Sequence, residues 1–347
     1  MDKIRIVHVG LGGWGGNWAT HVLPTHPDIE AVGYVEIVGD KRKSFAERLG
    51  RPPDLFHERL EQAFAAGPVD AVTIAVPIAL HEPIARQALE AGKHVVVEKP
   101  FTATMAEARG LVDLAESKGL VLAVSQNYRY YPAAQMVAEL AHSLGFGKLV
   151  GGKLDFRRNN IFARGGNLTW PNPMVADMAV HHYDLMRMIV GADPVEISAR
   201  SWNPPNSTYS EDPCAAMVLS FPNDINISYR GSWVDAGPQT AWAGEWQLDF
   251  EKASIFWTGR GAEPWQTKKD RVAIKRQHEE LEEVELPPYP LHDRAGVLHA
   301  FAETLRSGKS PAYFPSGRAN LGTLATIEAA LKSAAQKGAP VRLDSIG

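Results

Sequence analysis

The sequence contains few of the features that mark secreted, disulfide-stabilised or membrane proteins. Cys214 is its single cysteine, which excludes an internal disulfide and a cysteine-rich zinc site. No apolar run approaches the ~18 residues that a membrane-spanning helix needs. The first residues, MDKIRIVHVG, begin a strand-like pattern without the apolar region and cleavage site of a signal peptide. We therefore expect a cytoplasmic protein that does not contact a membrane.

The chain also lacks an excess of charge of either sign. It has 36 Lys and Arg residues against 40 Asp and Glu residues, so the formal net charge is -4 at pH 7. This balance favours neither nucleic acid nor an acidic surface as a partner, and a small molecule is the partner that we expect. A chain of 347 residues, 45% of them hydrophobic, is long enough for two domains with sizeable cores.

Short apolar runs alternate with amphipathic, helix-like stretches over the first part of the chain. The runs are IRIVHVG, IEAVGYVE, DAVTIAVP, HVVVEKP and LVLAVSQN. Strands that alternate with helices predict a parallel sheet covered on both faces. The pattern therefore predicts an α/β fold with a doubly wound, Rossmann-type domain over residues 1–127 and a second domain over residues 128–347.

The first apolar run leads into GLGGWGG, in which Gly10, Gly12 and Gly15 form a G-x-G-x-x-G motif. The motif follows a predicted strand and precedes a predicted helix, and Glu36 ends the second strand, as a dinucleotide site requires. The glycines allow the pyrophosphate to approach the backbone, and a carboxylate at position 36 would bind the adenosine ribose hydroxyls. Because that carboxylate repels a 2′-phosphate, we expect NAD rather than NADP.

Three segments together resemble the Gfo/Idh/MocA oxidoreductases, which include glucose–fructose oxidoreductase and inositol dehydrogenase. They are GLGGWGG, PIALHEPIARQALEAGKHVVVEKP and DMAVHHYDLMRMIVG. The resemblance runs from residue 4 to about residue 195 and continues loosely beyond. It implies a Rossmann domain followed by an α+β domain with a large, open, mostly antiparallel sheet. In the family this sheet often forms the subunit interface, so a homodimer or homotetramer is expected.

The resemblance also implies the position of an active site. The family's E-K-P falls on Glu98, Lys99 and Pro100, with the lysine directed toward the nicotinamide and the reacting hydroxyl. The pattern D-x-G-x-H-x-x-D falls on Asp177, His181 and Asp184, with Ala179 in place of the usual glycine. The pattern P-N-x-x-H runs from Pro77 to His81, with Ile78 in place of the usual asparagine. The cofactor-binding residues expected from the motifs are Gly10, Gly12, Gly13, Trp14, Gly15, Glu36, Pro77, His81, Glu98, Lys99 and Asn127.

Two neighbouring histidines in DMAVHHYDLMRMIVG receive different predictions. Asp177 and His181 are four residues apart, so one face of a helix carries both. His182 belongs to an apolar face shared with Met178 and Leu185, and we interpret it as a satisfied core residue. A metal is not expected, because Asp177 and His181 leave the third protein ligand of a catalytic zinc site undefined.

After the first domain, strand-like runs follow one another without long crossover helices, as in an antiparallel sheet. Seven tryptophans fall in this part of the chain, and we expect most of them to pack in the core or at an interface. Polar residues at strand ends should face the substrate. The expected substrate-binding residues are Lys99, Arg129, Arg157, Asn160, Trp170, Asp177 and His181.

These observations predict an NAD-dependent oxidoreductase that acts on a secondary alcohol of a sugar, an inositol or a related polyol. His181 would accept the hydroxyl proton, Asp177 would orient the imidazole or hold a neighbouring hydroxyl, and Lys99 would stabilise the developing alkoxide. Two alternatives remain open at this point. One is a glycoside hydrolase of the same fold that retains NAD, and the other is a non-catalytic regulator that binds a dinucleotide.

Overall fold

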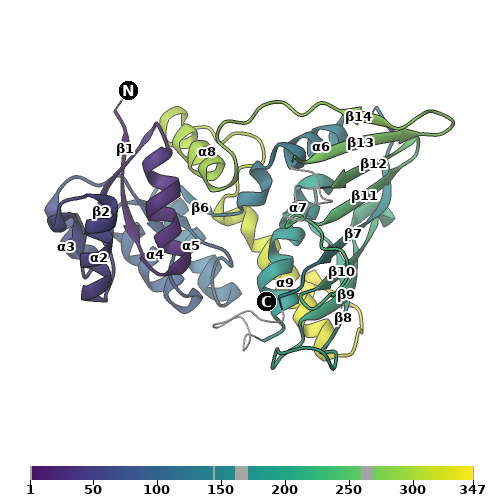
Figure 1. The fold of residues 1–347 in the computed structure, drawn as a ribbon, viewed down its shortest axis with the longest axis horizontal. Coiled ribbons are helices and arrows are strands. Elements are labelled where there is room, and N and C mark those ends of the chain that lie inside the picture. Colours follow the sequence, from purple (N-terminus) through teal and green to yellow (C-terminus); the bar gives the residue numbers. More distant parts are fainter. Residues whose placement is uncertain (1, 144, 161–170, 259–268, 347) are drawn as a thin grey trace. The chain divides into compact units, whose positions relative to one another are not determined.

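The computed structural model describes residues 2–143, 145–160, 171–258 and 269–346. The chain forms two compact units (Figure 1). The first unit contains Met1–Asn127 and Leu291–Leu321, and the second contains Tyr128–Pro290 and Gly322–Gly347. The sequence places a boundary after residue 127 and all later residues in the second domain. The structure instead groups Leu291–Leu321 with the first unit.

A six-stranded sheet forms the centre of the first unit. Its strands are β1 (Ile4–Val9), β2 (Ile29–Val35), β3 (Phe56–His57), β4 (Ala71–Ile74), β5 (His94–Val97) and β6 (Leu122–Val124). They pair in parallel in the order β3-β2-β1-β4-β5-β6. This is the strand order of dinucleotide-binding sheets, and the order reverses at the junction of β1 and β4. The predicted doubly wound α/β domain is confirmed.

Helices of the first unit connect these strands, apart from α8, which comes from the segment Leu291–Leu321. They are α1 (Gly13–Asn17), η1 (Trp18–Val22), η2 (Leu23–Thr25), α2 (Gly39–Leu49), η3 (Pro53–Leu55), α3 (Leu60–Ala66), η4 (Ile78–Leu80), α4 (His81–Glu90), α5 (Met105–Ser117) and α8 (Asp293–Ser307). Local sequence sets their ends: Thr104 and Glu107 form a capping box at the start of α5, and Gly50 ends α2 with a φ of 59°. Within the described ranges, no helix is both long and apolar enough to cross a membrane.

The second unit contains a nine-stranded sheet. Its strands are β7 (Leu149–Arg157), β8 (Glu196–Trp202), β9 (Cys214–Ser220), β10 (Asn226–Ser232), β11 (Glu245–Phe250), β12 (Ala253–Thr258), β13 (Arg271–Arg276), β14 (Glu282–Val284) and β15 (Val341–Arg342). The order is β14-β13-β12-β11-β7-β10-β9-β8-β15. All neighbours are antiparallel except β10 and β7. The predicted, mostly antiparallel sheet is therefore confirmed.

The two faces of this sheet differ in polarity. Leu154, Tyr229, Trp246 and Trp257 point to one face and are buried. Helices α6 (Pro132–His142), α7 (Ala179–Val190) and α9 (Gly317–Ala335) run along one side of the sheet (Figure 1). The alternate positions of the strands carry mostly polar or charged residues that are partly or fully exposed, such as Lys153, Ser228, Arg230, Gln247 and Glu245. This alternation is typical of an antiparallel sheet with one covered face.

Candidate active site

The glycine-rich turn between β1 and α1 has the shape that a dinucleotide site needs. Gly10 has a φ of +100°, and a Cβ there would lie 2.3 Å from the carbonyl oxygen of Ala75. A Cβ on Gly15 would lie 2.2 Å from the carbonyl oxygen of Gly10, so helix and strand pack through these glycines. A Cβ on Gly12 or Gly13 would meet no atom within 4 Å. The first and third motif glycines therefore permit the turn, and the second leaves its backbone open to a ligand.

Glu36 follows β2, and its carboxylate forms a hydrogen bond with the backbone of the glycine-rich turn. One carboxylate oxygen accepts a hydrogen bond from the backbone N–H of Leu11 at 3.0 Å, and the other accepts one from Val38 at 3.1 Å. The Arg42 guanidinium bonds the carbonyl oxygens of Glu36 and Ile37, at 2.5 and 3.0 Å. Each carboxylate oxygen keeps a second acceptor position, which a ribose hydroxyl could use.

Two loops at the carboxyl end of the sheet are joined by a buried histidine. The Nδ1 atom of His81 lies 2.9 Å from the carbonyl oxygen of Pro100, and Nε2 lies 2.9 Å from that of Val76. Burial lowers the pKa of His81, and the neighbouring carbonyl oxygens oppose that shift. The ring connects the loop after β4 to the loop after β5, which is a structural role in addition to the predicted contact with cofactor.

The segment Glu98–Pro100 stands directly after β5. Glu98 is buried, and its carboxylate accepts hydrogen bonds from the Trp18 indole N–H at 2.7 Å and from the backbone N–H of Lys99 at 3.1 Å. Lys99 is half-buried, and the Lys99–Pro100 peptide bond is cis. The carboxyl ends of parallel strands are where open α/β sheets bind ligands, so Lys99 has the position that a residue contacting cofactor or substrate requires.

In the second unit, Asp177 and His181 lie where one helix changes geometry. Asp177 belongs to a π-helical turn, η7 (Met174–Met178), and His181 lies in the first turn of α7. The sequence predicts one uniform helix here, whereas the structure begins it with the wider turn. Such turns occur frequently at functional sites. Ala179, which replaces the family glycine, is fully buried.

The imidazole of His181 packs flat against an aromatic ring. The centroids of the His181 and Tyr128 rings are 4.1 Å apart and their planes differ by 11°. Tyr128 in turn stacks on Tyr131, with a centroid distance of 4.9 Å. Stacking on one face restricts rotation of the imidazole, so Tyr128 defines the plane in which the ring nitrogens of His181 lie. This contact could not be predicted, because Tyr128 and His181 are far apart in the chain.

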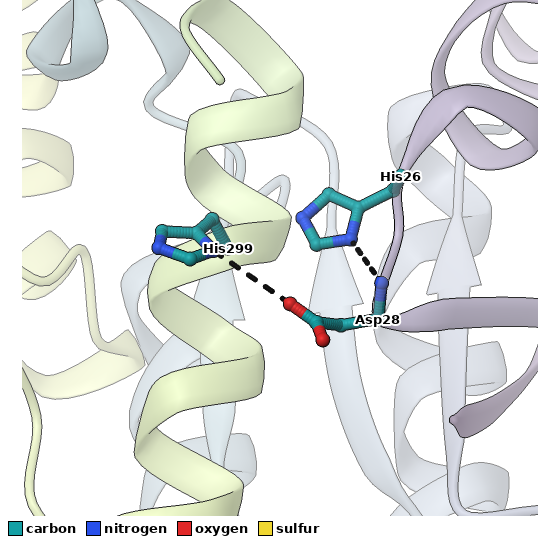
Figure 2. Close-up of side chains that lie close together, drawn as sticks. All are labelled: His26, Asp28 and His299. Atoms are coloured by element: carbon teal, nitrogen blue, oxygen red, sulfur yellow. Dashed lines mark hydrogen bonds and ion pairs between the residues drawn. The ribbon is translucent and has the colours of Figure 1, made fainter. Parts of the chain in front are cut away.

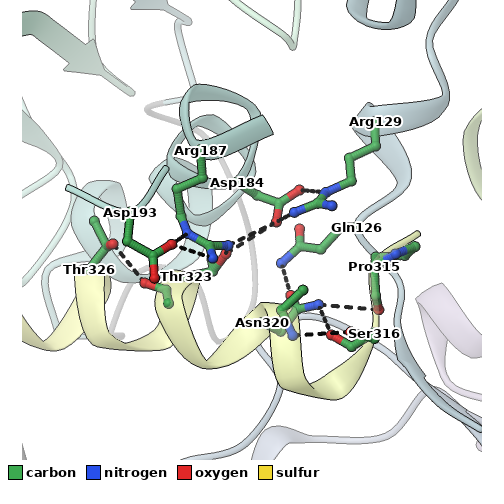
Figure 3. Close-up of polar contacts among 12 residues, drawn as sticks. Gln126, Arg129, Asp184, Arg187, Asp193, Pro315, Ser316, Asn320, Thr323 and Thr326 are labelled. Atoms are coloured by element: carbon green, nitrogen blue, oxygen red, sulfur yellow. Dashed lines mark hydrogen bonds and ion pairs between the residues drawn. The ribbon is translucent and has the colours of Figure 1, made fainter. Parts of the chain in front are cut away.

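Arg129, which the sequence predicts to contact substrate, takes part in a buried ion pair. Its guanidinium forms a two-point ion pair with Asp184, through Nε at 2.5 Å and Nη2 at 2.7 Å, and both side chains are buried (Figure 3). The hydroxyl of Thr323 also donates to Asp184, at 3.1 Å. Asp184 and Arg129 thus have structural partners in the second unit. A substrate contact by Arg129, expected because it follows the last strand of the first domain, stays a prediction.

Figure 3 also shows a separate polar group in the first unit. The Gln126 amide donates to the side-chain oxygen of Asn320 at 2.9 Å, and the Asn320 amide donates to the carbonyl oxygens of Pro315 and Ser316. These bonds attach the segment Leu291–Leu321 to the end of the six-stranded sheet.

Asn160 lies in a polar group of the second unit that includes Asp177. The amide of Asn160 donates to the Tyr209 hydroxyl at 3.3 Å. Burial raises the pKa of Tyr209, the hydrogen bond with Asn160 opposes that shift, and the negative charge of Asp177 raises the pKa further. The structure thus brings two predicted residues into one neighbourhood and adds Tyr209, which the sequence analysis missed because it lies in a segment without a motif.

Sequence comparison identifies both halves of the chain. The model of an oxidoreductase family with an NAD-binding Rossmann fold matches residues 4–126, and the model of the GFO/IDH/MocA C-terminal domain matches residues 134–256. The chain belongs to the Gfo/Idh/MocA oxidoreductase family. The resemblance inferred from the motifs is thereby confirmed, as is NAD as the cofactor of its Rossmann domain.

Individual proteins of other organisms match most of the chain. An uncharacterized protein of Sinorhizobium fredii is 28% identical over 347 residues, which cover 98% of this chain and 95% of the relative. The dTDP-3,4-didehydro-2,6-dideoxy-alpha-D-glucose 3-reductase of Streptomyces violaceoruber is 26% identical and covers 92% and 91%. An inositol dehydrogenase homologue of Azotobacter vinelandii, crystallised with NADH and myo-inositol, superposes with a TM-score of 0.82 at 19% identity and covers 98% of each chain. The last comparison shows that the two proteins share a fold.

The first unit fits the NAD that the Gfo/Idh/MocA family binds. The backbone at Gly12 and Gly13 leaves open a space that side chains at these positions would fill, and a pyrophosphate can bind there. Glu36 directly follows the neighbouring strand, β2. Other predicted cofactor residues are already engaged: Asn127 donates a hydrogen bond to Asp293. Trp14 is half-exposed beside the glycines.

His182 is a core residue, as the sequence predicts. Its side chain is fully buried, with Nδ1 lying 3.1 Å from the Tyr229 hydroxyl and Nε2 lying 3.0 Å from the carbonyl oxygen of Trp242. Burial lowers the pKa of His182 to about 4, so the ring is neutral near pH 7. Both ring nitrogens are satisfied, which leaves none for chemistry.

Two further residues, Arg157 and Trp170, were predicted to contact substrate. Arg157 pairs with Asp155 at 2.9 Å and with Glu245 at 3.0 Å, and these contacts place it among the charges of the sheet. Trp170 lies outside the described residues. Substrate contacts by both residues stay predictions.

One histidine–aspartate cluster in the first unit has the composition of a metal site (Figure 2). Nδ1 of His26 accepts the backbone N–H of Asp28 at 3.2 Å, so the neutral ring carries its proton on Nε2, which then cannot bind a metal. The Asp28 carboxylate is bound by Arg306 at 2.6 Å, and the His299 Nδ1 lies 3.9 Å from it. These contacts connect α8 to the segment before β2, and they favour a structural role for the cluster.

Proposed function

We propose that this Gfo/Idh/MocA protein transfers a hydride between NAD and a secondary alcohol or ketone of a sugar, an inositol or a related polyol. The observation that carries the proposal is the position of Lys99. It stands at the carboxyl end of β5, in a domain of NAD-binding type, with its backbone N–H fixed by the buried Glu98. An ammonium group at this edge can hydrogen-bond a substrate oxygen and stabilise negative charge on it.

Each proposed catalytic residue has a separate task. NAD, when bound, accepts or supplies the hydride. His181, with its ring plane set by Tyr128, removes the proton from the reacting hydroxyl, because an imidazole ordinarily titrates near neutral pH. Asp177 orients that imidazole or holds a neighbouring hydroxyl. Lys99 stabilises the alkoxide that develops as the proton leaves.

The substrate class is supported by relatives and by polar side chains. The Streptomyces violaceoruber relative is a reductase of a dTDP-linked sugar, and the Azotobacter vinelandii homologue was crystallised with myo-inositol. In this chain, Asn160 and Tyr209 lie near Asp177 and offer amide and hydroxyl groups of the kind that bind polyols. We propose that these two residues contact substrate hydroxyls.

The proposal is tested by offering the purified protein NAD together with a panel of inositols, aldoses, ketoses and nucleotide-linked sugars. Absorbance at the NADH band should rise with at least one secondary alcohol. Cleavage of a glycoside with NAD bound but never consumed would indicate the hydrolase alternative. No redox change and no cleavage with any compound, by a protein that binds NAD, would contradict the proposal and favour the regulator.

A further inference from the structure

Arg294 is an unusual residue of the first unit because its charged side chain is buried. It lies in the first turn of α8 and is 9% exposed. Among the described residues, the guanidinium makes one hydrogen bond, from Nη2 to the side-chain oxygen of Asn17 at 2.7 Å. The Nε and Nη1 atoms are buried without a hydrogen-bond partner. The Asp293 carboxylate forms a long ion pair with Nε, at 3.9 Å, which is too far for a hydrogen bond.

Aromatic rings hold this guanidinium against the helical segment that follows the glycine-rich turn. The Arg294 Cζ atom lies 4.2 Å from the centroid of the Trp14 ring and 5.7 Å from that of Trp18. Trp14 itself belongs to the glycine motif, between Gly13 and Gly15, and is 52% exposed. Residues 14, 17 and 18 share one helical face, so Arg294 approaches that turn from a single side.

Contact with two indole rings does not account for the unused N–H groups. A cation over an aromatic face is stabilised through the face of the guanidinium, while its N–H groups point outward in the plane. Leaving such groups buried and unpaired is unfavourable, and a buried charge is normally compensated by a counter-ion. Asp293 balances part of this charge, and the unpaired N–H groups give Arg294 the properties of a binding site for a further anion from outside the chain.

We propose that Arg294 is a cofactor-binding residue that donates hydrogen bonds to the pyrophosphate of NAD. The pyrophosphate is the anionic part of this cofactor, and the Gly12–Gly13 backbone beside Trp14 is the surface left open for it. The planar fork of arginine matches phosphate oxygens with two parallel hydrogen bonds. Trp14 is then the platform that orients the guanidinium. The inference depends on NAD binding by the Rossmann domain and is independent of the substrate.

The test compares three variants by calorimetric titration with NAD, ADP-ribose and adenosine, in the absence of any alcohol substrate. Arg294→Met removes the charge and keeps the apolar stem over Trp14. We expect it to weaken the binding of NAD and of ADP-ribose by about 10- to 100-fold, the range of a hydrogen bond to a charged group. Binding of adenosine, which has no phosphate, should stay unchanged. Arg294→Lys keeps the charge without the fork and should lie between the wild type and Arg294→Met.

Arg306→Met is the matched control, since Arg306 lies on the same helix and pairs with Asp28. It should bind all three ligands as the wild type does. The proposal is overturned if Arg294→Met binds NAD as tightly as the wild type, or if it weakens adenosine and ADP-ribose equally, which would show a purely structural role. A thermal unfolding midpoint for each variant separates loss of fold from loss of binding. A failed substrate panel would leave these titrations unaffected.

Discussion

At the scale of single residues, Glu36 shows how one carboxylate can serve both fold and selectivity. Its two oxygens bind the backbone N–H groups of Leu11 and Val38, which fixes the carboxylate beside the glycine-rich turn. Arg42, which stands between Lys41 and Lys43 in the sequence, is bound to the carbonyl oxygens of Glu36 and Ile37. It is thus engaged in local structure rather than presented as a site for a 2′-phosphate. This arrangement favours NAD over NADP.

We therefore predict that NAD binds at least about tenfold more tightly than NADP, because the 2′-phosphate would meet the Glu36 carboxylate. Glu36→Gln removes the charge and retains an oxygen that can accept a backbone hydrogen bond, so it should narrow the difference. Titration of both dinucleotides by protein fluorescence measures it. Glu47→Gln, an exposed change on α2, is the control. Equal affinities for the two cofactors in the wild type would contradict the position assigned to Glu36.

Sequence motifs identified residues at the ends of strands and missed residues that act through packing. The glycines, Glu36 and Lys99 could be predicted, because each stands at a fixed place relative to a strand of a parallel sheet. Tyr128, Tyr209 and Arg294 could not, because their partners come from distant segments. The ion pair of Arg129 with Asp184 was not predicted either. The sequence cannot show that Asp184 lies within reach of its guanidinium.

At the scale of elements, the helix that carries His181 is the most deeply buried of the second unit. All but two residues of α7 are buried, and it is preceded by the π-helical turn that holds Asp177. A buried helix has little freedom to shift, so the two residues keep a fixed relation. Two neighbouring histidines of this helix have different surroundings. His181 stacks on Tyr128, whereas His182 forms hydrogen bonds inside the core.

His182 makes stability depend on pH. Its pKa is lowered by burial from 6.5 to about 4 in the folded protein, so the unfolded chain binds an additional proton between these values. The contribution of the neutral His182 to the free energy of unfolding is therefore fully present above about pH 6.5, and it is lost as the pH falls toward 4. The shift of about 2.5 pH units corresponds to a loss of about 3 kcal/mol at most. His8, with its pKa also lowered to about 4 by burial, adds to the effect.

We predict that His182→Gln reduces the pH dependence of the urea unfolding midpoint between pH 7.5 and 5, compared with the wild type. The variant should be less stable than the wild type at pH 7.5, and it should lose less stability than the wild type does when the pH is lowered to 5. His278→Gln, a change at an exposed histidine, should keep the wild-type slope. Identical slopes for the wild type and His182→Gln would show that His182 is not the neutral core residue described here.

Elements with a clear apolar pattern were predicted, and those without one were missed. The long strands and helices α8 and α9 follow the sequence pattern closely. The two-residue strand β3, the helix α3 and the helix α6 were missed. A two-residue strand is too short to show alternation, and α6, with the sequence PAAQMVAELAH, contains several small apolar residues that do not define a face.

At the scale of the whole molecule, the first unit contains a second, later segment of the chain, which follows most of the residues of the second unit. The residues Leu291–Leu321 supply α8, Arg294 and Asn320 to the Rossmann unit. A linear pattern of helices and strands contains no information about such a return. The boundary after residue 127 follows from the change of pattern at that point, and the later crossing follows only from tertiary contacts.

The outer face of the nine-stranded sheet changes the reason for expecting an oligomer. We expected most tryptophans of this domain to pack in the core or at an interface, and Trp233, Trp246 and Trp257 are buried within the unit itself. The partly exposed positions instead contain a network of opposite charges around Asp155. Alternating charges are self-complementary across a two-fold axis. An assembly through this face would therefore be held by polar contacts.

We predict a homodimer or homotetramer at micromolar concentration whose dissociation increases with salt, since exposed ion pairs are screened. Light scattering at 0.1 M and 1 M sodium chloride, roughly a threefold change in screening length, measures this. Arg230→Ala, which removes two ion pairs from the outer face, should favour the smaller species. A monomer at both salt concentrations would contradict the expectation.

The central claim of the proposed function is that Lys99 and His181 act on the same substrate hydroxyl. It is tested most directly by the rate of NAD reduction in a single turnover, measured for Lys99→Ala, His181→Ala, the double variant and His182→Ala. We predict that each of the first two lowers the rate by about 10² to 10⁴ with NAD affinity nearly intact. The double variant should be little slower than either, because groups that act as a unit are not additive. His182→Ala should lower the free energy of unfolding while leaving the single-turnover rate nearly unchanged. A folded His182→Ala without turnover beside an active His181→Ala would contradict the account.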